Sequence, residues 1–384
     1  MRFKRLGATV SAGESVSGND VASKDKKTAK SAGKPPVETR GGTPNHRAKI
    51  TINDVARLAN VSKKTVSRVI NESPLVRQET REKVKAIIAE HGYAPDPQAR
   101  ALAFRRSFLV GMIYDNPSPQ YVVNMQRGIL DVLADTSFQL VLHPCERSEE
   151  NFRQKIHTFV SQQKPLGVIL PPSVSEDDAL AEMLEELGCD YVRIASVELD
   201  KPSRMVRTHD AEGAAQAARH LASLGHEKIA HIHGLSTFRS AHERLAGFKA
   251  GLKEHGLTLQ KKWTVEGAYT FDSGVQCAEK LIYSDARPTA IFTGNDEMAV
   301  GAYQAVRKAG LQVPEDISIV GFDDTPMASR VWPPMTTVRL PIREMGRAAA
   351  SLLLMEPVEK AAAELVSFTP EIVVRDSAAP PKKV

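Results

Sequence analysis

The stretch ITINDVARLANVSKKTVSRVIN, residues 50–71, decides the fold of the front of this chain. Thr51 stands three residues before Asp54, which is the spacing of a helix-capping box. Apolar residues then recur at helical spacing, at Val55, Leu58 and Ala59. This periodicity predicts a first short helix with one apolar face.

A second helix is predicted directly after the first. Asn60 and Val61 break the apolar pattern, and Ser62 is a suitable N-cap. The inward positions are Val66, Val69 and Ile70, and the opposite positions are Lys63, Lys64, Thr65, Ser67 and Arg68. A helix with an apolar back and a short basic, hydroxyl-rich front fits the major groove of DNA. The alternative is a common helical pair with a solvated charged face.

Charge is spread unevenly along the chain. Residues 1–46 carry nine Lys and Arg against four Asp and Glu, and residues 47–106 carry thirteen against six. Since the formal net charge of all 384 residues is +5, the remainder is net acidic. A basic front on an acidic body predicts a polyanionic partner for the front only.

From residue 108 the pattern alternates between short apolar runs and amphipathic helical stretches. The runs are 108–114, 138–143, 166–171, 191–195, 228–234, 289–294 and 317–322, and the clearest helical stretches are 120–135, 214–225, 243–256 and 295–310. Such alternation predicts parallel sheets covered by helices on both faces. The length suggests two doubly wound lobes, with a ligand in the cleft at the carboxyl ends of the strands.

Several classes of protein are disfavoured. The three cysteines, an odd number at wide spacing, predict reduced thiols in a cytoplasm. No apolar run has membrane-spanning length, and the N-terminus has no apolar signal core. The motifs of serine hydrolases, P-loop enzymes and zinc proteases are absent, so an enzyme is not expected. The pair His231 and His233 has no acidic or cysteine cluster beside it, so neither a metal nor another cofactor is predicted.

The string D-V-A-x-x-A-x-V-S-x-x-T-V-S-R-V-I-N, residues 54–71, strongly resembles the DNA-binding start of the lactose-repressor (LacI) family of bacterial regulators. The resemblance continues through the core, which in this family is similar to type I periplasmic sugar-binding proteins. It implies an all-α helix-turn-helix head on a two-lobed α/β core, and a homodimer on a palindromic operator. The implied DNA contacts are Thr51, Ser62, Lys63, Lys64, Thr65, Ser67, Arg68 and Asn71, with Leu102 of a hinge helix wedged into the minor groove.

The expected boundaries follow from composition and resemblance together. They are a disordered basic extension at 1–48, the DNA-binding domain at 49–95, a hinge helix or linker at 96–107, the two-lobed core at 108–376 and a disordered tail at 377–384. A third helix near residues 78–91, ended by Gly92, completes the DNA-binding domain. The tail carries no leucine heptad, which favours a dimer over a tetramer.

Three core segments carry the resemblance to the family's effector site. They are R-S-A-H-E-R-L-A-G-F from Arg239, T-G-N-D-E-M-A-V-G-A from Thr293 and I-V-G-F-D-D-T-P from Ile319. The implied effector contacts are Tyr269, Arg239, Arg244, Asn295 and Asp323, with Asp210 as a further possibility and His242 less favoured. Such side chains suit the paired hydrogen bonds and the apolar ring face of a sugar. The alternatives are helix caps at Asn295 and Asp323 and lobe packing at Tyr269.

The sequence therefore predicts a cytoplasmic, DNA-binding transcriptional regulator, a repressor, whose operator affinity is controlled allosterically by a small effector such as a sugar. A sugar-binding protein without a regulatory role and an α/β enzyme are the competing hypotheses.

Overall fold

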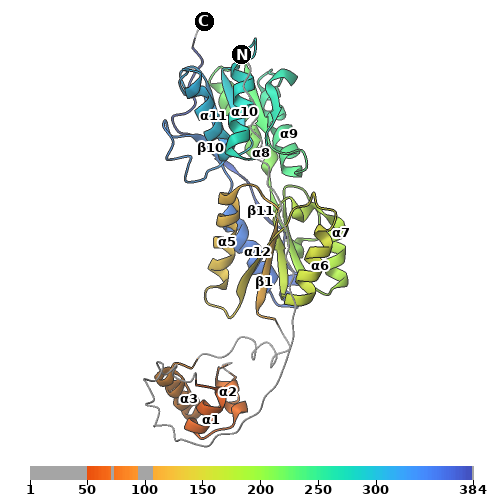
Figure 1. Cartoon of the computed structure of the whole chain (residues 1–384), viewed down its shortest axis with the longest axis vertical. Coiled ribbons are helices and arrows are strands. Elements are labelled where there is room, and N and C mark those ends of the chain that lie inside the picture. Colours follow the sequence, from red (N-terminus) through yellow and green to blue (C-terminus); the bar gives the residue numbers. More distant parts are fainter. Residues whose placement is uncertain (1–49, 71–72, 94–106, 383–384) are drawn as a thin grey trace, which may run out of the picture. The chain divides into compact units, whose positions relative to one another are not determined.

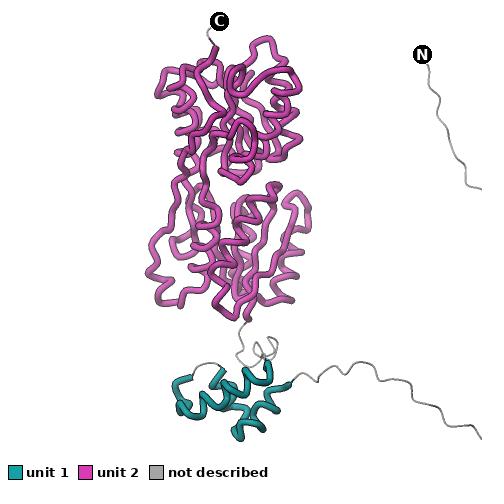
Figure 2. Tube along the Cα trace, turned by 90° about the vertical axis from the view of Figure 1, so that its left-hand side faces the viewer, with its two compact units in different colours: residues 1–94 teal, residues 95–384 magenta. Residues whose placement is uncertain are grey.

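The computed structural model describes residues 50–70, 73–93 and 107–382. The chain divides into two compact units, residues 1–94 and 95–384 (Figure 2). Each unit is described by itself. The expected extension at 1–48, residues 96–106 of the hinge expected at 96–107, Asn71 and Leu102 lie outside the described residues.

The first unit contains three helices, α1 (Ile52–Ala59), α2 (Lys63–Ile70) and α3 (Gln78–His91). Its core consists of Val55, Ala56, Ala59, Val66, Val69 and Val84. The predicted apolar stripe was wrong at Leu58, which is 46% exposed, because Ala56 turns inward in its place. Asn60 ends α1 in the left-handed conformation that asparagine tolerates, and this permits the tight turn to α2.

The second unit begins with a lobe, called the N lobe, built on a sheet with strand order β11-β5-β4-β3-β1-β2. Its strands are β1 (Leu109–Tyr114), β2 (Gln139–Pro144), β3 (Gly167–Leu170), β4 (Asp190–Ala195), β5 (Met205–Thr208) and β11 (Val366–Phe368), all parallel. One face is covered by α5 (Pro119–Leu133) and α12 (Ile342–Leu354), the other by α6 (Phe152–Gln163) and α7 (Asp178–Glu186) (Figure 1). Short turns of helix are η1 (Val174–Glu176), η2 (Pro202–Arg204) and α13 (Pro357–Ala361).

The other lobe, called the C lobe, has the strand order β12-β10-β9-β8-β6-β7. Its strands are β6 (Ile229–His233), β7 (Thr264–Glu266), β8 (Ala290–Thr293), β9 (Ser318–Asp323), β10 (Thr336–Arg339) and β12 (Glu371–Val373). Only β12 runs antiparallel to its neighbour. The helices are α8 (Asp210–Ser223), α9 (Arg239–Glu254), α10 (Phe271–Ile282) and α11 (Asp296–Lys308), with η3 (Lys261–Trp263). The pairs α8 with α9 and α10 with α11 make the closest helix contacts of this lobe.

The chain passes between the two lobes three times. These crossings lie between β5 and α8, between β10 and α12, and between β11 and β12. Each lobe is therefore completed by segments that are distant in sequence. The seven predicted apolar runs are all strands, whereas the short strands β5, β7, β10, β11 and β12 were not predicted.

The C-terminal segment differs from the disordered tail expected at residues 377–384. Ser377 is fully buried, where its hydroxyl accepts from the Thr336 backbone N–H at 2.8 Å. The Ala379 carbonyl accepts from the Ser318 hydroxyl at 3.1 Å, and Lys382 pairs with Asp316 at 2.8 Å. Residues 377–382 thus pack on the C lobe, because they form hydrogen bonds and an ion pair with it. Composition alone does not predict such contacts. Within the described part of the chain, no helix is long and apolar enough to cross a membrane.

Candidate functional site

The helix α2 presents the basic and hydroxyl side chains that the sequence pattern predicted. Ser62 caps it, since its hydroxyl accepts from the Thr65 backbone N–H at 3.1 Å and lies 2.9 Å from the Thr65 hydroxyl. Lys63 and Lys64 are exposed, and Arg68 is partly exposed. Because Val66 and Val69 are fully buried on the opposite side, the polar face is turned outward. This arrangement suits insertion into a DNA groove.

Thr51 is exposed at the start of α1 and is engaged in a complete capping box. Its hydroxyl donates to the Asp54 carboxylate at 2.7 Å, and its own backbone N–H donates to the same carboxylate at 3.0 Å. These bonds hold the pKa of Asp54 below its usual value, with the Thr51 contacts as the main cause. The first helix of the pair is therefore fixed by its own sequence.

A cavity lies between the two lobes, with a volume of about 40 Å³. It is lined by Asn116, Ser118, Tyr121, Pro172, Thr208, Asp210, Phe238, Ser240, Arg244, Tyr269, Asn295, Asp323, Leu340 and Met345. Four of the five predicted effector residues and the further candidate Asp210 meet here. Typical ligand pockets hold roughly 300–1,000 Å³, so the free space in this cavity is small for a ligand.

Arg244 lies at the centre of the cavity, on α9. Its Nε donates to Asp210 at 2.8 Å, its Nη1 donates to the Gly294 carbonyl, and its guanidinium stacks on the Phe322 ring at 3.7 Å. Both Arg244 and Asp210 are buried, and the neighbouring carboxylates raise the pKa of Arg244 against the opposing effect of burial. The cationic charge is thus already matched inside the protein.

Asp323 is the last residue of β9 and also lines the cavity. It has a φ of 110°, which is unusual for a residue other than glycine, and burial raises its pKa well above the usual value. Backbone strain of this kind is concentrated at functional sites. Behind it, Asp296 accepts from the backbone N–H and hydroxyl of Thr325 at 2.6 and 2.9 Å, which holds the loop after β9.

Asn295 performs the capping role that was the alternative interpretation and also lines the cavity. Its Oδ1 accepts from the Met298 backbone N–H at 3.0 Å, and its Nδ2 donates to the Tyr269 carbonyl at 3.0 Å. Tyr269 has a φ of 60° and packs edge-on against Phe238, with ring centroids 5.3 Å apart. A Cβ at Gly234 would lie 1.8 Å from the Tyr269 ring, so this ring position requires glycine there.

Other predicted residues lie elsewhere. The Arg239 side chain is exposed and is not part of the cavity lining. His242 is exposed and its Nε2 lies 2.7 Å from the Ser236 carbonyl. His231 is fully buried and stacked on Phe292 at 4.8 Å, and burial lowers its pKa to about 3. Among the described residues, no three His, Cys, Asp or Glu side chains could hold a metal ion together.

The N-lobe side of the cavity was missed from the sequence. Asn116 and Ser118 follow β1, Tyr121 stands in the first turn of α5, and Thr208 ends β5. The Tyr121 hydroxyl is buried and finds no hydrogen-bond partner within the described residues. The run Asp115-Asn116-Pro117-Ser118 directly after a predicted strand was the available signal, because strand carboxyl ends line such clefts.

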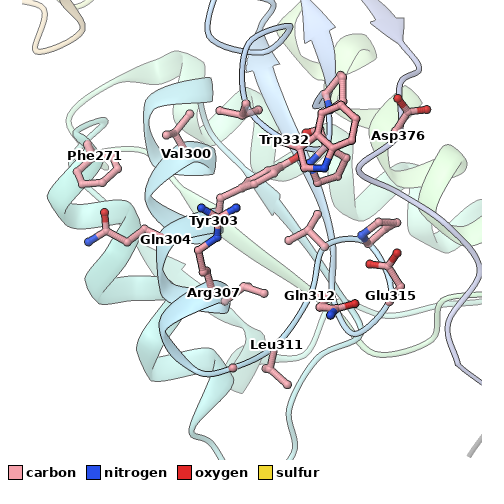
Figure 3. A pocket seen from close by; sticks show the side chains of 17 residues that line it. Phe271, Val300, Tyr303, Gln304, Arg307, Leu311, Gln312, Glu315, Trp332 and Asp376 are labelled. Atoms are coloured by element: carbon pink, nitrogen blue, oxygen red, sulfur yellow. The ribbon is translucent and has the colours of Figure 1, made fainter.

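A second, open depression of about 1210 Å³ lies on the C lobe, beside α11 (Figure 3). Val300, Tyr303 and Arg307 of α11 line it together with Trp332 and Phe271. Trp332 is 79% exposed, and Phe271 belongs to this depression and not to the cavity between the lobes. An exposed tryptophan beside apolar neighbours is typical of a protein interface.

Comparison with family models gives two matches. Residues 51–96 match the family of bacterial regulatory proteins called lacI, and residues 218–378 match the periplasmic binding protein-like domain. The matches cover the helix-turn-helix and most of the C lobe. They define a class of DNA-binding transcriptional regulators that carry a periplasmic-binding-protein-like core.

Individual relatives are similar over most of the chain. The HTH-type transcriptional regulator DegA of Bacillus subtilis is 34% identical over 86% of this chain and 99% of its own. The ribose operon repressor of Escherichia coli is 32% identical over 85% and 99%. This chain therefore belongs to the LacI family of bacterial transcriptional regulators, and these relatives are regulators and not enzymes.

Solved structures show the same architecture. A lac repressor dimer bound to operator and the anti-inducer ONPF superposes with a TM-score of 0.74 at 30% identity, covering 86% of this chain and 99% of that one. A complex of the transcriptional regulator CelR with cellobiose gives a TM-score of 0.64 at 31% identity, covering 86% and 100%. The predicted family, fold class and regulatory function are confirmed.

Proposed function

We propose that this regulator is a cytoplasmic repressor that binds a palindromic operator as a homodimer. Its affinity for the operator falls or rises when a neutral sugar enters the cavity between the lobes. The proposal is supported by two features of the same chain: the exposed basic face of α2 and a cavity between the lobes that is lined by hydrogen-bonding side chains. The lac repressor dimer on operator and CelR with cellobiose support the same combination in relatives.

The DNA contacts are assigned to the outward face of α2. Arg68, Lys64 and Lys63 supply cations, and Ser62, Thr65, Ser67 and Thr51 supply hydroxyls to bases and phosphates. Asn71 and Leu102 keep the DNA-contact roles that the family resemblance implies, with Leu102 in the minor groove. Two copies then read two half-sites of the operator.

The effector is assigned to the class of uncharged, hydroxyl-rich molecules. Of the charged residues that line the cavity, Arg244 is already paired with Asp210, and Asp323 adds a second carboxyl group. A phosphate or carboxylate ligand would meet these acidic groups without a free cation from the described lining, which is unfavourable in a buried site. Sugar hydroxyls can donate to Asp323 and accept from Asn295, and Tyr269 offers a ring face.

Effector entry is linked to lobe movement. The cavity of about 40 Å³ is too small for a sugar, so the lobes separate or rotate when one binds. The three crossings between the lobes are the segments about which that motion takes place. A ligand that favours one lobe arrangement changes operator affinity by its difference in affinity for the two arrangements.

We assign the contact with the second copy of the homodimer to the depression beside α11. Tyr303 and Trp332 form an aromatic surface there (Figure 3), and Trp332 exposes 79% of its area. Trp332→Glu should convert the protein to a monomer in sedimentation velocity. Tyr283→Ser removes another exposed aromatic residue, outside the depression, and serves as the control. A dimer that survives Trp332→Glu would rule out this surface.

The effector is tested by a thermal-shift screen of the full-length protein against neutral sugars, sugar phosphates and uronates. Only neutral sugars are expected to raise the melting temperature. Asp323→Asn and Asn295→Ala should each weaken the binding of the selected sugar about tenfold, equivalent to about 1.4 kcal/mol. Effector-free operator binding should stay within a factor of two in both variants. Tighter binding of a sugar phosphate than of its neutral parent would overturn the assignment.

A further inference from the structure

Glu176 makes a contact between the lobes that the effector site does not explain. It ends η1 in the N lobe, and its side chain is buried with 8% exposure. Both carboxylate oxygens lie within hydrogen-bond distance of the Arg239 backbone N–H, at 3.1 and 3.2 Å. Arg239 is the first residue of α9, which belongs to the C lobe. A carboxylate of the N lobe thus accepts a hydrogen bond from the first backbone N–H group of a C-lobe helix.

The start of α9 lacks a cap of its own. Its N-cap residue is Phe238, whose side chain cannot accept a hydrogen bond. By contrast, Thr270 caps α10 and Asn295 caps α11 from within the same lobe. The first N–H groups of a helix need acceptors, and the helix dipole favours a negative group there. Glu176 supplies that acceptor from across the cleft.

The loop that carries Glu176 is held firmly in the N lobe. The buried Arg193 donates from Nε to the Ser175 carbonyl at 2.6 Å and from Nη1 to the Leu199 carbonyl at 3.2 Å. Arg153 binds Asp177 through two hydrogen bonds of 3.0 and 2.8 Å, and Asp177 also caps α7. Since the residues on both sides of Glu176 are anchored, its carboxylate is a fixed support and not a mobile surface group.

The helix that Glu176 contacts also builds the effector cavity. Phe238 precedes α9, and Ser240 and Arg244 lie in its first two turns; all three line the cavity. We propose that Glu176 is a positioning residue: by capping α9 from the N lobe it holds the lobes closed over the cavity and keeps Arg244 in place. The role of this contact in regulation rests on the proposed effector function. The closing of the lobes by Glu176 does not depend on that function.

The first test measures backbone amide exchange in the effector-free, full-length protein. In Glu176→Ala, the Arg239 amide should exchange about tenfold faster, because its acceptor is gone. The other amides of the first turn of α9 should also exchange faster, because the lobes separate more often. Glu176→Gln keeps an acceptor without the charge and should restore part of the protection. Glu186→Ala, an exposed carboxylate of α7, is the control and should change nothing.

The second test removes the donor in place of the acceptor. Proline is accepted at the first position of a helix, so Arg239→Pro deletes the N–H group while keeping α9, and Arg239→Ala removes only the side chain. Electron-spin distance measurement between labels at Glu182→Cys and Lys249→Cys, with Cys145→Ser, reports lobe separation. Arg239→Pro and Glu176→Ala should each lengthen that distance, their combination should add nothing, and Arg239→Ala should leave it unchanged.

Unchanged exchange and unchanged distance in both Glu176→Ala and Arg239→Pro would overturn the proposal. Loss of protection throughout the C lobe would also overturn it, because Glu176 would then support folding and not lobe closure. Neither measurement uses an effector. A failed sugar screen therefore does not affect the conclusion about Glu176, and a negative result for Glu176 does not affect the effector assignment.

Discussion

The DNA-binding unit and the two-lobed core place their charged groups in opposite ways. In the first unit Lys63 and Lys64 stand exposed on α2, above a core of six small apolar side chains. In the core, Arg193 and Arg244 are 3% and 7% exposed and are paired with Asp178 and Asp210. Exposed charges can act on a partner without supporting the fold, whereas buried charges must be matched inside the protein.

The largest effect is expected at the most deeply buried pair. Arg244→Ala leaves the Asp210 carboxylate buried without its partner, which should lower the free energy of unfolding of the core by about 3–5 kcal/mol. Urea denaturation followed by circular dichroism measures it. The double variant Arg244→Met, Asp210→Asn should recover much of the lost unfolding free energy. Equal destabilisation in the single and double variants would show that the unpaired Asp210 carboxylate is not the cause.

The pH dependence of stability should differ between the two units. Burial raises the pKa of Asp296 from 3.8 to about 7, so its protonated form stabilises the folded core. That contribution is fully present below about pH 4 and is lost as pH rises through about 7, by at most ~1.4 kcal/mol per pH unit. Asp296→Asn should flatten this part of the curve, as measured by urea unfolding at pH 4 to 8.

Asp54 in the first unit provides the contrast to Asp296. Its pKa is lowered, so its contribution to stability is present above the usual pKa and lost as pH falls. The amide-exchange protection factors of residues 50–93, in which the intrinsic pH dependence of exchange is removed, should therefore fall on acidification. A slope of the same sign in both units would contradict the assignment of raised and lowered carboxyl groups.

A smaller effect, of a different kind, is expected on the recognition helix. Arg68→Ala should cost about 1–3 kcal/mol in operator binding and reduce sequence preference, while the unfolding free energy stays within ~0.5 kcal/mol. Fluorescence anisotropy on operator and on random DNA measures the operator affinity and the sequence preference. Lys83→Ala, an exposed cation of α3, is the matched control. Equal weakening on the two DNAs would make Arg68 a phosphate contact.

The smallest effect is expected at the first helix cap. Thr51→Ala removes the hydroxyl of the capping box and should destabilise the DNA-binding unit by about 1 kcal/mol. Faster amide exchange confined to residues 50–93 measures it, and Thr51→Ser should restore the wild-type rate. A change that extends to the lobes would show that the two units do not unfold independently.

The DNA-binding unit could be predicted almost residue by residue. Its caps at Thr51 and Ser62, the turn at Asn60 and the bounds of α3 all depend on residues within a few positions. The error at Leu58 arose because Ala56 and Leu58 compete for the inward side of an eight-residue helix. Periodicity alone does not separate such positions.

The cavity could be predicted only on its C-lobe side. Arg244, Asn295 and Asp323 stand in segments that resemble the family, and the structure brings them together. The pairing of Arg244 with Asp210 joins residues from two helices, and the contribution of Asn116 and Tyr121 comes from the other lobe. Glu176 carries no local signal at all, since its partner is a backbone N–H group 63 residues away.

The triple crossing between the lobes has a consequence for synthesis on the ribosome. The sheet of the N lobe receives its strand β11 only at Val366–Phe368, and its covering helix α12 only at Ile342–Leu354, after nearly all of the C lobe. A growing chain therefore carries an unfinished N lobe until translation is almost complete, whereas residues 50–93 are contiguous and can fold early. A truncated polypeptide that stops before residue 366 would keep the DNA-binding helices and the residues that line the cavity, but each sheet of the two-lobed core would lack one edge strand, β11 or β12.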